Sequence, residues 1–154
     1  MDARAPMGPE LAWTVRAQIY DHIVATGLPP TIWEAAASAR ISPVEATEAF
    51  TWLDAHHALV LDRDGTTIRI ANPFSGVPTG FRVHSGRQSY WANCAWDAVG
   101  IPAALHQDAV IYATLSDDGS QIEIAIDGGV LRHHDEFVHF PLPFASWYDD
   151  LIHT

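Results

Sequence analysis

The apolar residues of this chain change their spacing partway along the sequence, and this change limits the folds open to it. From Leu11 to Ile23 they recur every four residues, which predicts a helix that ends at Gly27. Residues 109–115 and 121–126 instead have the pattern of two strands joined by a turn. Helices followed by a mainly antiparallel sheet predict an α+β protein.

Two further helix starts follow the first helix. Thr31 with Glu34, and Ser42 with Glu45, have the spacing of a capping box, in which the two side chains bond to each other's backbone N–H groups. These signals predict helices over residues 32–39 and 43–57.

A β-hairpin is predicted next, because the apolar runs 59–61 and 67–70 flank a turn sequence rich in Asp and Gly. Three helices and a hairpin predict a winged-helix-like region at residues 10–71. Residues 1–9, with two prolines and a glycine, are expected to form a flexible arm.

The charge of the chain argues against nucleic acid or a membrane as a partner. The chain has 19 acidic residues against 8 basic ones and a formal net charge of −11, which repels phosphate backbones and anionic lipid. The helix expected at 43–57, which would be the recognition helix of a DNA-binding winged helix, has no Arg or Lys. We therefore interpret the helical region as structural.

One cysteine cannot form an internal disulfide, and the sequence contains no signal-peptide pattern or run of apolar residues long enough to span a membrane. These features favour the cytoplasm. They leave the oligomeric state open.

A second domain is expected after a linker at residues 72–80, which are rich in Pro and Gly. This domain, residues 81–154, is predicted to be a small sheet that holds one helix around Cys94. Gly100 and Pro102 are expected to break that helix. The predicted strands are 81–84, 109–115, 121–126, 129–131 and 137–140.

Cys94 and Asp97 are the residues to which we assign the chemistry. If residues 88–99 are helical, their spacing puts the thiol and the carboxylate on one face. A helix N-terminus would lower the pKa of the thiol, and burial beside Trp96 would raise the pKa of the carboxyl. The simpler alternative is that Cys94 is an inert residue of the core.

The stretch from Cys94 to Leu105 (C-A-W-D-A-V-G-I-P-A-A-L) resembles the core motif of the alkylmercury, or organomercurial, lyases, in which a C-A-x-D helix leads into an I/F-P-A-L stretch. The order of parts is similar as well, with a winged-helix-like region before a small sheet domain. The resemblance implies protonolysis of a carbon–mercury bond, with Cys94 as the ligand of the mercury in the substrate and Asp97 as the proton donor. It implies no resident cofactor.

The resemblance also implies a second cysteine near the C-terminus, at a position just after residues 149–154, where the sequence stops. We expect either that a longer chain supplies this cysteine or that an external thiol takes its place.

Trp91 and Trp96 flank Cys94 and are predicted to wall an apolar substrate pocket. The competing function is that of a diverged, non-catalytic member of the same fold. Such a protein would bind a thiophilic metal or a small apolar ligand, or would act as a partner-binding module.

The histidines offer two further hypotheses. One is a structural metal site in the potential ligands His133, His134, Asp135, Glu136 and His139, although a solvated edge explains the same residues without metal-site spacing. The other is a cysteine–histidine pair for acyl transfer, with His84 or His139 as the base.

Overall fold

The structure is a computed structural model that describes residues 8–132, 135–140 and 142–149. The chain divides into two compact units, Met1–Asn72 and Pro73–Thr154. The expected arm at residues 1–9 lies mostly outside the described residues, but Pro9 already belongs to the first helix.

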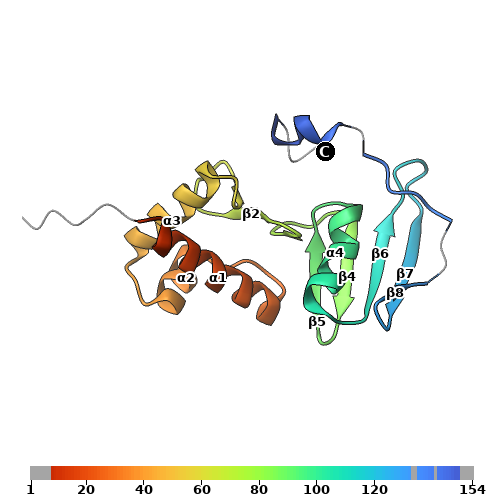
Figure 1. The fold of residues 1–154 in the computed structure, drawn as a ribbon, viewed down its shortest axis with the longest axis horizontal. Helices are drawn as coiled ribbons and strands as arrows, with labels where there is room; N and C mark the ends of the chain where they lie inside the picture. The colour runs from red at the N-terminus through yellow and green to blue at the C-terminus, as the bar shows by residue number, and fades with distance from the viewer. Residues whose placement is uncertain (1–7, 133–134, 141, 150–154) are drawn as a thin grey trace, which may run out of the picture. The chain divides into compact units, whose positions relative to one another are not determined.

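The first unit consists of three helices followed by a hairpin (Figure 1). Its elements are α1 (Pro9–Thr26), α2 (Ile32–Ala39), α3 (Pro43–Ala55), β1 (Val60–Leu61) and β2 (Ile68–Ala71). The three helices contact one another, and β1 pairs with β2 in antiparallel fashion. This is the element order that the sequence predicts, while the winged-helix assignment stays a prediction.

The helices of the first unit begin and end where local signals place them. The stripe Val15, Ile19 and Ile23 is buried, and Gly27 ends α1 in the left-handed conformation with φ 85°. Both predicted capping boxes, at the starts of α2 and α3, are present. The third helix ends at Ala55, two residues before the predicted end at residue 57.

The second unit is an antiparallel sheet with one helix. Within it the strands follow the order β3-β5-β4-β6-β7-β8. Its elements are β3 (Phe74–Ser75), β4 (Phe81–Ser85), β5 (Gln88–Ala92), α4 (Ala95–Leu105), β6 (Ala109–Thr114), β7 (Gln121–Asp127), β8 (Val130–Leu131) and the 3₁₀ helix η1 (Phe144–Asp149). Helices with an antiparallel sheet confirm the predicted α+β class.

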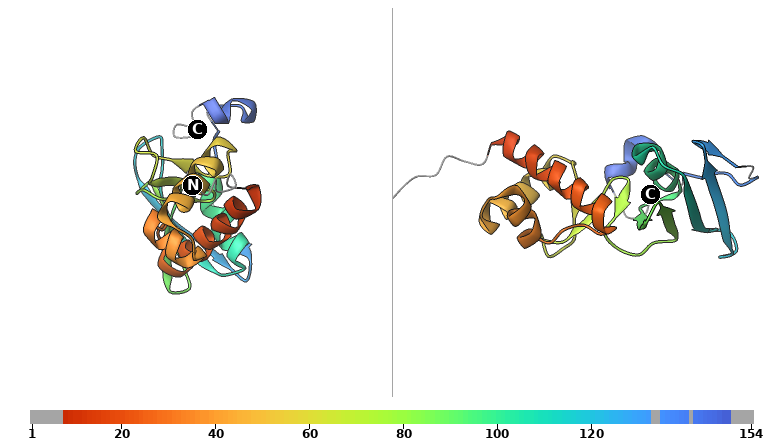
Figure 2. Two further views of the ribbon diagram at one scale, coloured as in Figure 1. Left: turned by 90° about the vertical axis from the view of Figure 1, so that its left-hand side faces the viewer. Right: turned by 90° about the horizontal axis from the view of Figure 1, so that it is seen from below.

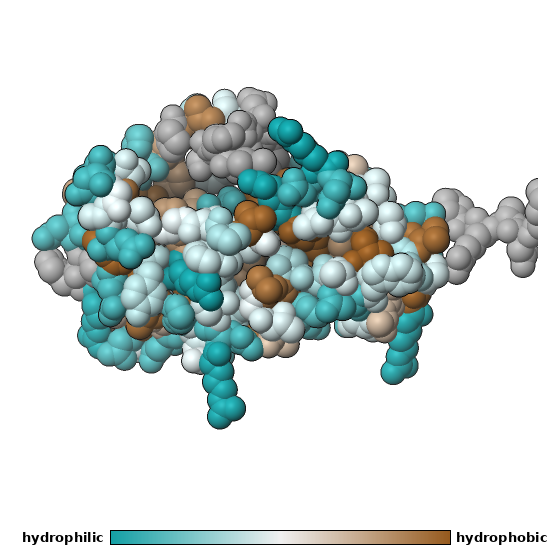
Figure 3. Space-filling view, turned by 180° about the vertical axis from the view of Figure 1, so that it is seen from behind, coloured by the Kyte–Doolittle hydropathy of each residue, from teal (hydrophilic) through white to brown (hydrophobic). Residues whose placement is uncertain are grey.

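Helix α4 covers one face of this sheet, across β4, β5 and β6 (Figures 1 and 2). Val83, Tyr90 and Ile111 are paired across these strands and buried on the covered face. Because side chains alternate along a strand, the neighbouring residues Arg82 and Tyr112 lie on the opposite, open face. The view from behind in Figure 3 shows a mainly hydrophilic surface on the second unit.

Two predictions around Cys94 are wrong. Residues 88–92 form strand β5 rather than the start of a helix, and they pair with both β3 and β4. Gly100 and Pro102 do not end α4, which continues to Leu105. Pro102 removes one backbone N–H from the helix, but its ring is fully buried with Ile101, so tertiary packing offsets the local loss.

Two boundaries also differ from the predictions. Residues 72–80, expected as a linker, contain β3, in which Phe74 pairs with Ala92 of β5. Residues 137–140 form no strand, and Phe137 is 94% exposed. The strand predicted at 129–131 is present as β8.

No helix in the parts of the chain that the structure describes has both the length and the apolar character needed to cross a membrane.

Candidate active site

Cys94 is the N-cap residue of α4 and not, as predicted, a residue within the helix. Its backbone is extended, with φ −147° and ψ 179°, and the first helical residue is Ala95. The chain is held just before this turn, because the Thr79 hydroxyl donates a hydrogen bond to the Ala92 carbonyl at 2.6 Å. The Asn93 N–H donates to the Pro73 carbonyl at 3.4 Å. The strand-to-helix turn therefore fixes where the thiol lies.

The thiol and the carboxylate of the predicted pair are in contact. Cys94 Sγ donates a hydrogen bond to Asp97 Oδ2 at 3.4 Å, and the Asp97 N–H donates to Cys94 Sγ at 3.5 Å. The sulfur thus receives one hydrogen bond from the helix N-terminus while its own proton faces the carboxylate.

The pKa of the Cys94 thiol is raised, so the predicted lowering is wrong. Partial burial is the main cause, and the charge of Asp97 and its hydrogen bond to the thiol raise the pKa further. The Asp97 N–H lowers it, as the helix N-terminus was expected to do, but does not outweigh burial. The prediction rested on the helix N-terminus and did not weigh the burial of the thiol against it.

The pKa of Asp97 is raised, in the direction that the sequence predicts. Burial is the main cause, and the hydrogen bond from Cys94 opposes it. A protonated thiol therefore points at a carboxyl group that is itself readier than usual to hold a proton. If a soft metal ion binds the sulfur and displaces the thiol proton, Asp97 Oδ2 lies within hydrogen-bond distance and can accept that proton.

Trp96 lies in the first turn of α4 and is 59% exposed, so it does not close off the site alone. Its ring meets Phe140 edge-on, with centroids 6.4 Å apart, and Phe140 stacks on Trp147 at 5.3 Å. Trp147 Nε1 donates to the Leu142 carbonyl at 3.1 Å. We call Trp96, Phe140 and Trp147 the aromatic cluster. In the sequence, the only signal for this cluster is the high density of aromatic residues near the C-terminus.

Trp91 does not share a pocket wall with Trp96, which corrects the prediction. It follows the buried Tyr90 on β5, so its side chain lies on the open face of the sheet, where the Arg82 guanidinium sits 4.4 Å from its ring centre. Strand alternation at residues 88–92 would have shown this, had those residues been read as a strand.

The histidine hypotheses gain no support from the geometry. His84 is on the open face with its ring edge-on to Tyr112, at 5.3 Å, so it does not pair with Cys94 on α4. His139 is exposed, and His133 and His134 lie outside the described residues. Within residues 8–132, 135–140 and 142–149, no three His, Cys, Asp or Glu side chains form a group that could hold a metal ion.

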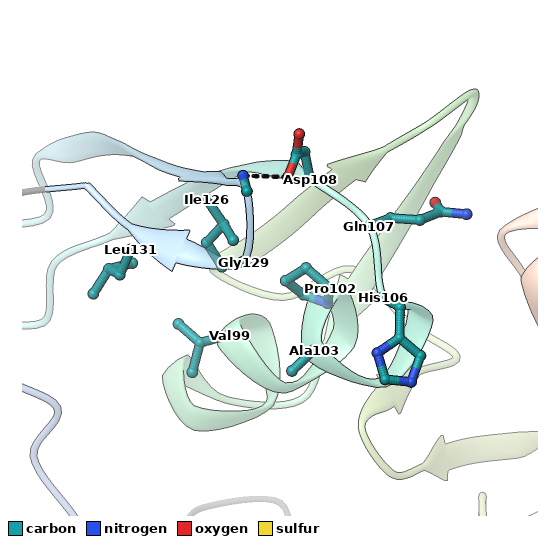
Figure 4. Close-up of a pocket in the computed structure, with 10 residues that line it drawn as sticks. Val99, Pro102, Ala103, His106, Gln107, Asp108, Ile126, Gly129 and Leu131 are labelled. Atoms are coloured by element: carbon teal, nitrogen blue, oxygen red, sulfur yellow. Dashed lines mark hydrogen bonds between the residues drawn. The ribbon is translucent and has the colours of Figure 1, made fainter.

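A cavity of about 700 Å³ lies beside the C-terminal half of α4. Figure 4 shows Val99, Ile126 and Leu131 around this space, between α4 and the β7–β8 hairpin. Asp108 stands at its rim and accepts a hydrogen bond from the Gly128 N–H at 2.7 Å. Neither Cys94 nor Asp97 lines this cavity, so it is separate from the thiol–carboxylate pair.

Comparison with known proteins identifies the same half of the chain. A family model described as alkylmercury lyase matches residues 74–152, just over half of the 154 residues. The fold is similar to the crystal structure of the mercury-bound form of MerB2, with a TM-score of 0.65 and 22% sequence identity. The match covers 82% of this chain and 60% of that chain, so this chain spans less than two thirds of its length. No curated protein matches the chain.

Proposed function

The chain belongs to the alkylmercury lyase family, and from this premise we propose that it cleaves carbon–mercury bonds by protonolysis at Cys94 and Asp97. The substrate class is an organomercurial, R–Hg–X, with R an alkyl or aryl group and X an exchangeable ligand. Mercury enters as part of the substrate and leaves as part of the product.

The proposed reaction has two proton transfers. In the first, Cys94 Sγ forms a bond to mercury, X leaves, and the thiol proton passes to Asp97 Oδ2. In the second, Asp97 returns that proton to the carbon, the electron pair of the C–Hg bond forms the new C–H bond, and R–H leaves. Mercury stays in the divalent state throughout, so no oxidant or reductant is needed.

One observation carries this proposal: the 3.4 Å hydrogen bond from Cys94 Sγ to Asp97 Oδ2. It gives the first proton transfer a direct path. Burial supports the second transfer, because it raises the pKa of Asp97 and so favours the protonated carboxyl that must deliver the proton.

A second sulfur ligand would weaken the C–Hg bond further, because soft thiolates hold mercury strongly. The 154 residues contain one cysteine, so in an assay of this chain an added small thiol supplies that ligand and also removes the product mercury. We further propose that the organic group R lies against the aromatic cluster, of which Trp96 is the member nearest to Cys94 in the sequence.

The direct test is incubation with a phenylmercury salt and an excess of small thiol, with measurement of released benzene. We expect benzene from the wild-type chain, and none above the rate of thiol alone from Cys94→Ser or Asp97→Asn. Benzene release that survives Cys94→Ser would exclude Cys94 as the mercury ligand.

A second candidate function, binding of a small apolar ligand without catalysis, is favoured by the cavity beside α4. Its volume of about 700 Å³ is in the range of ligand sites, and apolar side chains line most of it. This function predicts no benzene release, together with binding of an apolar probe that Val99→Trp blocks and Cys94→Ser does not.

A further inference from the structure

The open face of the second unit's sheet carries a small polar cavity that the proposed reaction does not use. Its volume is about 290 Å³. It is lined by Thr79, Gly80, Arg82, His84, Trp91, Tyr112, Thr114 and Gln121. The strands β4, β5, β6 and β7 all contribute to it, so its side chains stand on a rigid sheet.

Arg82 is the one formal charge in this lining, and its position is fixed. Its Nε donates a hydrogen bond to Ser89 Oγ at 2.7 Å, and its guanidinium lies 4.4 Å from the centre of the Trp91 ring. The ion pairs found in the described part of the chain involve Arg69 and Arg132, not Arg82. Among the residues that the structure describes, the Arg82 side chain donates its hydrogen bond through Nε, so its two terminal nitrogens keep their donors for another group.

The surroundings of Arg82 match an anion. Tyr112 lies directly opposite Arg82 on β6, and Thr114 and Gln121 are paired at the next position along the same face. Each of these side chains offers a neutral donor. No acidic residue lines the cavity, although 19 of the 154 residues are acidic.

The neighbouring acidic group on this face is Glu123. It is exposed and pairs with Tyr112 on the next strand, outside the lining of the cavity. His84 meets the Tyr112 ring edge-on at 5.3 Å, so that ring is held beside Arg82. The local charge therefore favours an anion, although the chain as a whole, with a formal net charge of −11, repels one.

We propose that this cavity binds a small aromatic monocarboxylate. A guanidinium edge with two free nitrogens matches the two oxygens of a carboxylate, and one positive charge balances one negative charge. The side of the Tyr112 ring, which is 44% exposed, supplies a surface for a flat apolar body. A volume of about 290 Å³ limits the ligand to a single small ring.

The experiment is titration of the full chain with benzoate, followed by calorimetry and by backbone amide chemical shifts. We expect saturable binding, with shift changes at residues 82, 112 and 114 and none near Cys94. Arg82→Gln should weaken binding by about tenfold or more, because it removes the charge that pairs with the carboxylate. Arg87→Gln is the matched control, since Arg87 is exposed on the turn between β4 and β5 and does not line the cavity.

Three further arms make the result decisive. Arg82→Lys keeps the charge but loses the two-nitrogen fork, so it should bind more weakly than the wild type and guards against a folding defect in Arg82→Gln. Benzamide, the neutral analogue, should not bind, and inorganic phosphate should bind more weakly than benzoate. The proposal is overturned by equal binding of benzamide, by tighter binding of phosphate, by unchanged binding in Arg82→Gln, or by no binding of benzoate up to about 10 mM.

Discussion

Three helices of this chain start in the same way, with a capping side chain followed three residues later by a carboxylate. At the start of α3, Glu45 Oε2 accepts from the Ser42 N–H at 2.8 Å and from its hydroxyl at 2.7 Å, while Ser42 Oγ accepts from the Glu45 N–H at 3.3 Å. Helix α2 repeats this arrangement with Thr31 and Glu34. At α4 the residues are Cys94 and Asp97, and half of the arrangement is missing.

The missing half is the hydrogen bond from the N-cap backbone N–H to the carboxylate. Cys94 Sγ still accepts from the Asp97 N–H, but the Asp97 carboxylate accepts from the thiol and not from the Cys94 N–H. Aspartate is one methylene shorter than glutamate, and sulfur is larger than oxygen, so the carboxylate does not reach back to the N-cap backbone.

The pKa of the carboxyl group shifts in opposite directions at the complete capping box of α2 and at the incomplete one of α4. The hydrogen bond from the Thr31 backbone is the main cause that lowers the pKa of Glu34, whereas burial is the main cause that raises the pKa of Asp97. Similar local geometry thus goes with a lowered pKa at an exposed carboxyl group in one place and with a raised pKa at a partly buried carboxyl group in the other. The proposed reaction relies on this difference, because it needs a thiol cap next to a carboxyl group that can hold a proton.

Cys94→Ser should produce the largest effect, because it restores the chemistry of an ordinary cap while removing the soft ligand. We expect benzene release from phenylmercury to fall to the rate of thiol alone. We also expect the thermal unfolding midpoint to stay equal to that of the wild type or to rise, since Ser is among the best N-cap residues. A large loss of stability would instead mean that Cys94 matters chiefly for packing.

Asp97→Asn separates the two roles of the carboxylate. Benzene release should again be lost, because the amide has no proton to deliver, while mercury binding to Cys94 should remain. The pH profile of Cys94 alkylation should shift to lower pH, since the charge of Asp97 and its hydrogen bond both raise the thiol pKa. An unmoved profile would show that Asp97 is already protonated in the wild type.

Ser42→Ala tests the ordinary member of the comparison. Loss of the cap should reduce the free energy of unfolding by about 1 kcal/mol, within a range of about 0.5–2 kcal/mol. The rate of benzene release per folded molecule should not change. Urea unfolding and the phenylmercury assay measure the two quantities, and Thr31→Ala provides a second variant of the same kind.

Local signals predicted much of the fold, because capping boxes, turn sequences and apolar periods act over a few residues. The boxes at Ser42 and Thr31 and the hairpin strands were predicted in this way, and the motif from Cys94 to Leu105 gave the correct family. Strand β5 was missed, although the spacing of Cys94 and Asp97 is itself a helix-start signal that should have placed the helix after Cys94.

Other features depend on contacts that no short window of sequence contains. The thiol pKa follows mainly from burial of Cys94, and α4 continues through Pro102, whose side chain is fully buried. The aromatic cluster joins Trp96 to Phe140, which is far away in the sequence. The cavity around Arg82 requires the register of β4 with β5 and β6, which sequence patterns alone do not fix.

The smallest expected effect is the opposite pH dependence of the two carboxylates. The folded state raises the pKa of Asp97, so between the unfolded value of about 3.9 and the raised value it binds more protons than the unfolded state. The contribution of Asp97 to stability therefore falls as pH rises through that interval. The folded state lowers the pKa of Glu34, so its contribution rises as pH increases from that lowered value to the unfolded one.

Paired variants turn this difference into a measurement. As pH rises from about 3 to 7, the stability of Asp97→Asn should improve relative to the wild type, while that of Glu34→Gln should worsen. Urea midpoints across this range give both slopes, and Glu48→Gln is a control, because Glu48 lies on α3 away from either kind of helix start. Slopes of the same sign would mean that Asp97 is stabilised as a carboxylate like Glu34, and the proposed proton-carrier role of Asp97 would then lose its electrostatic basis.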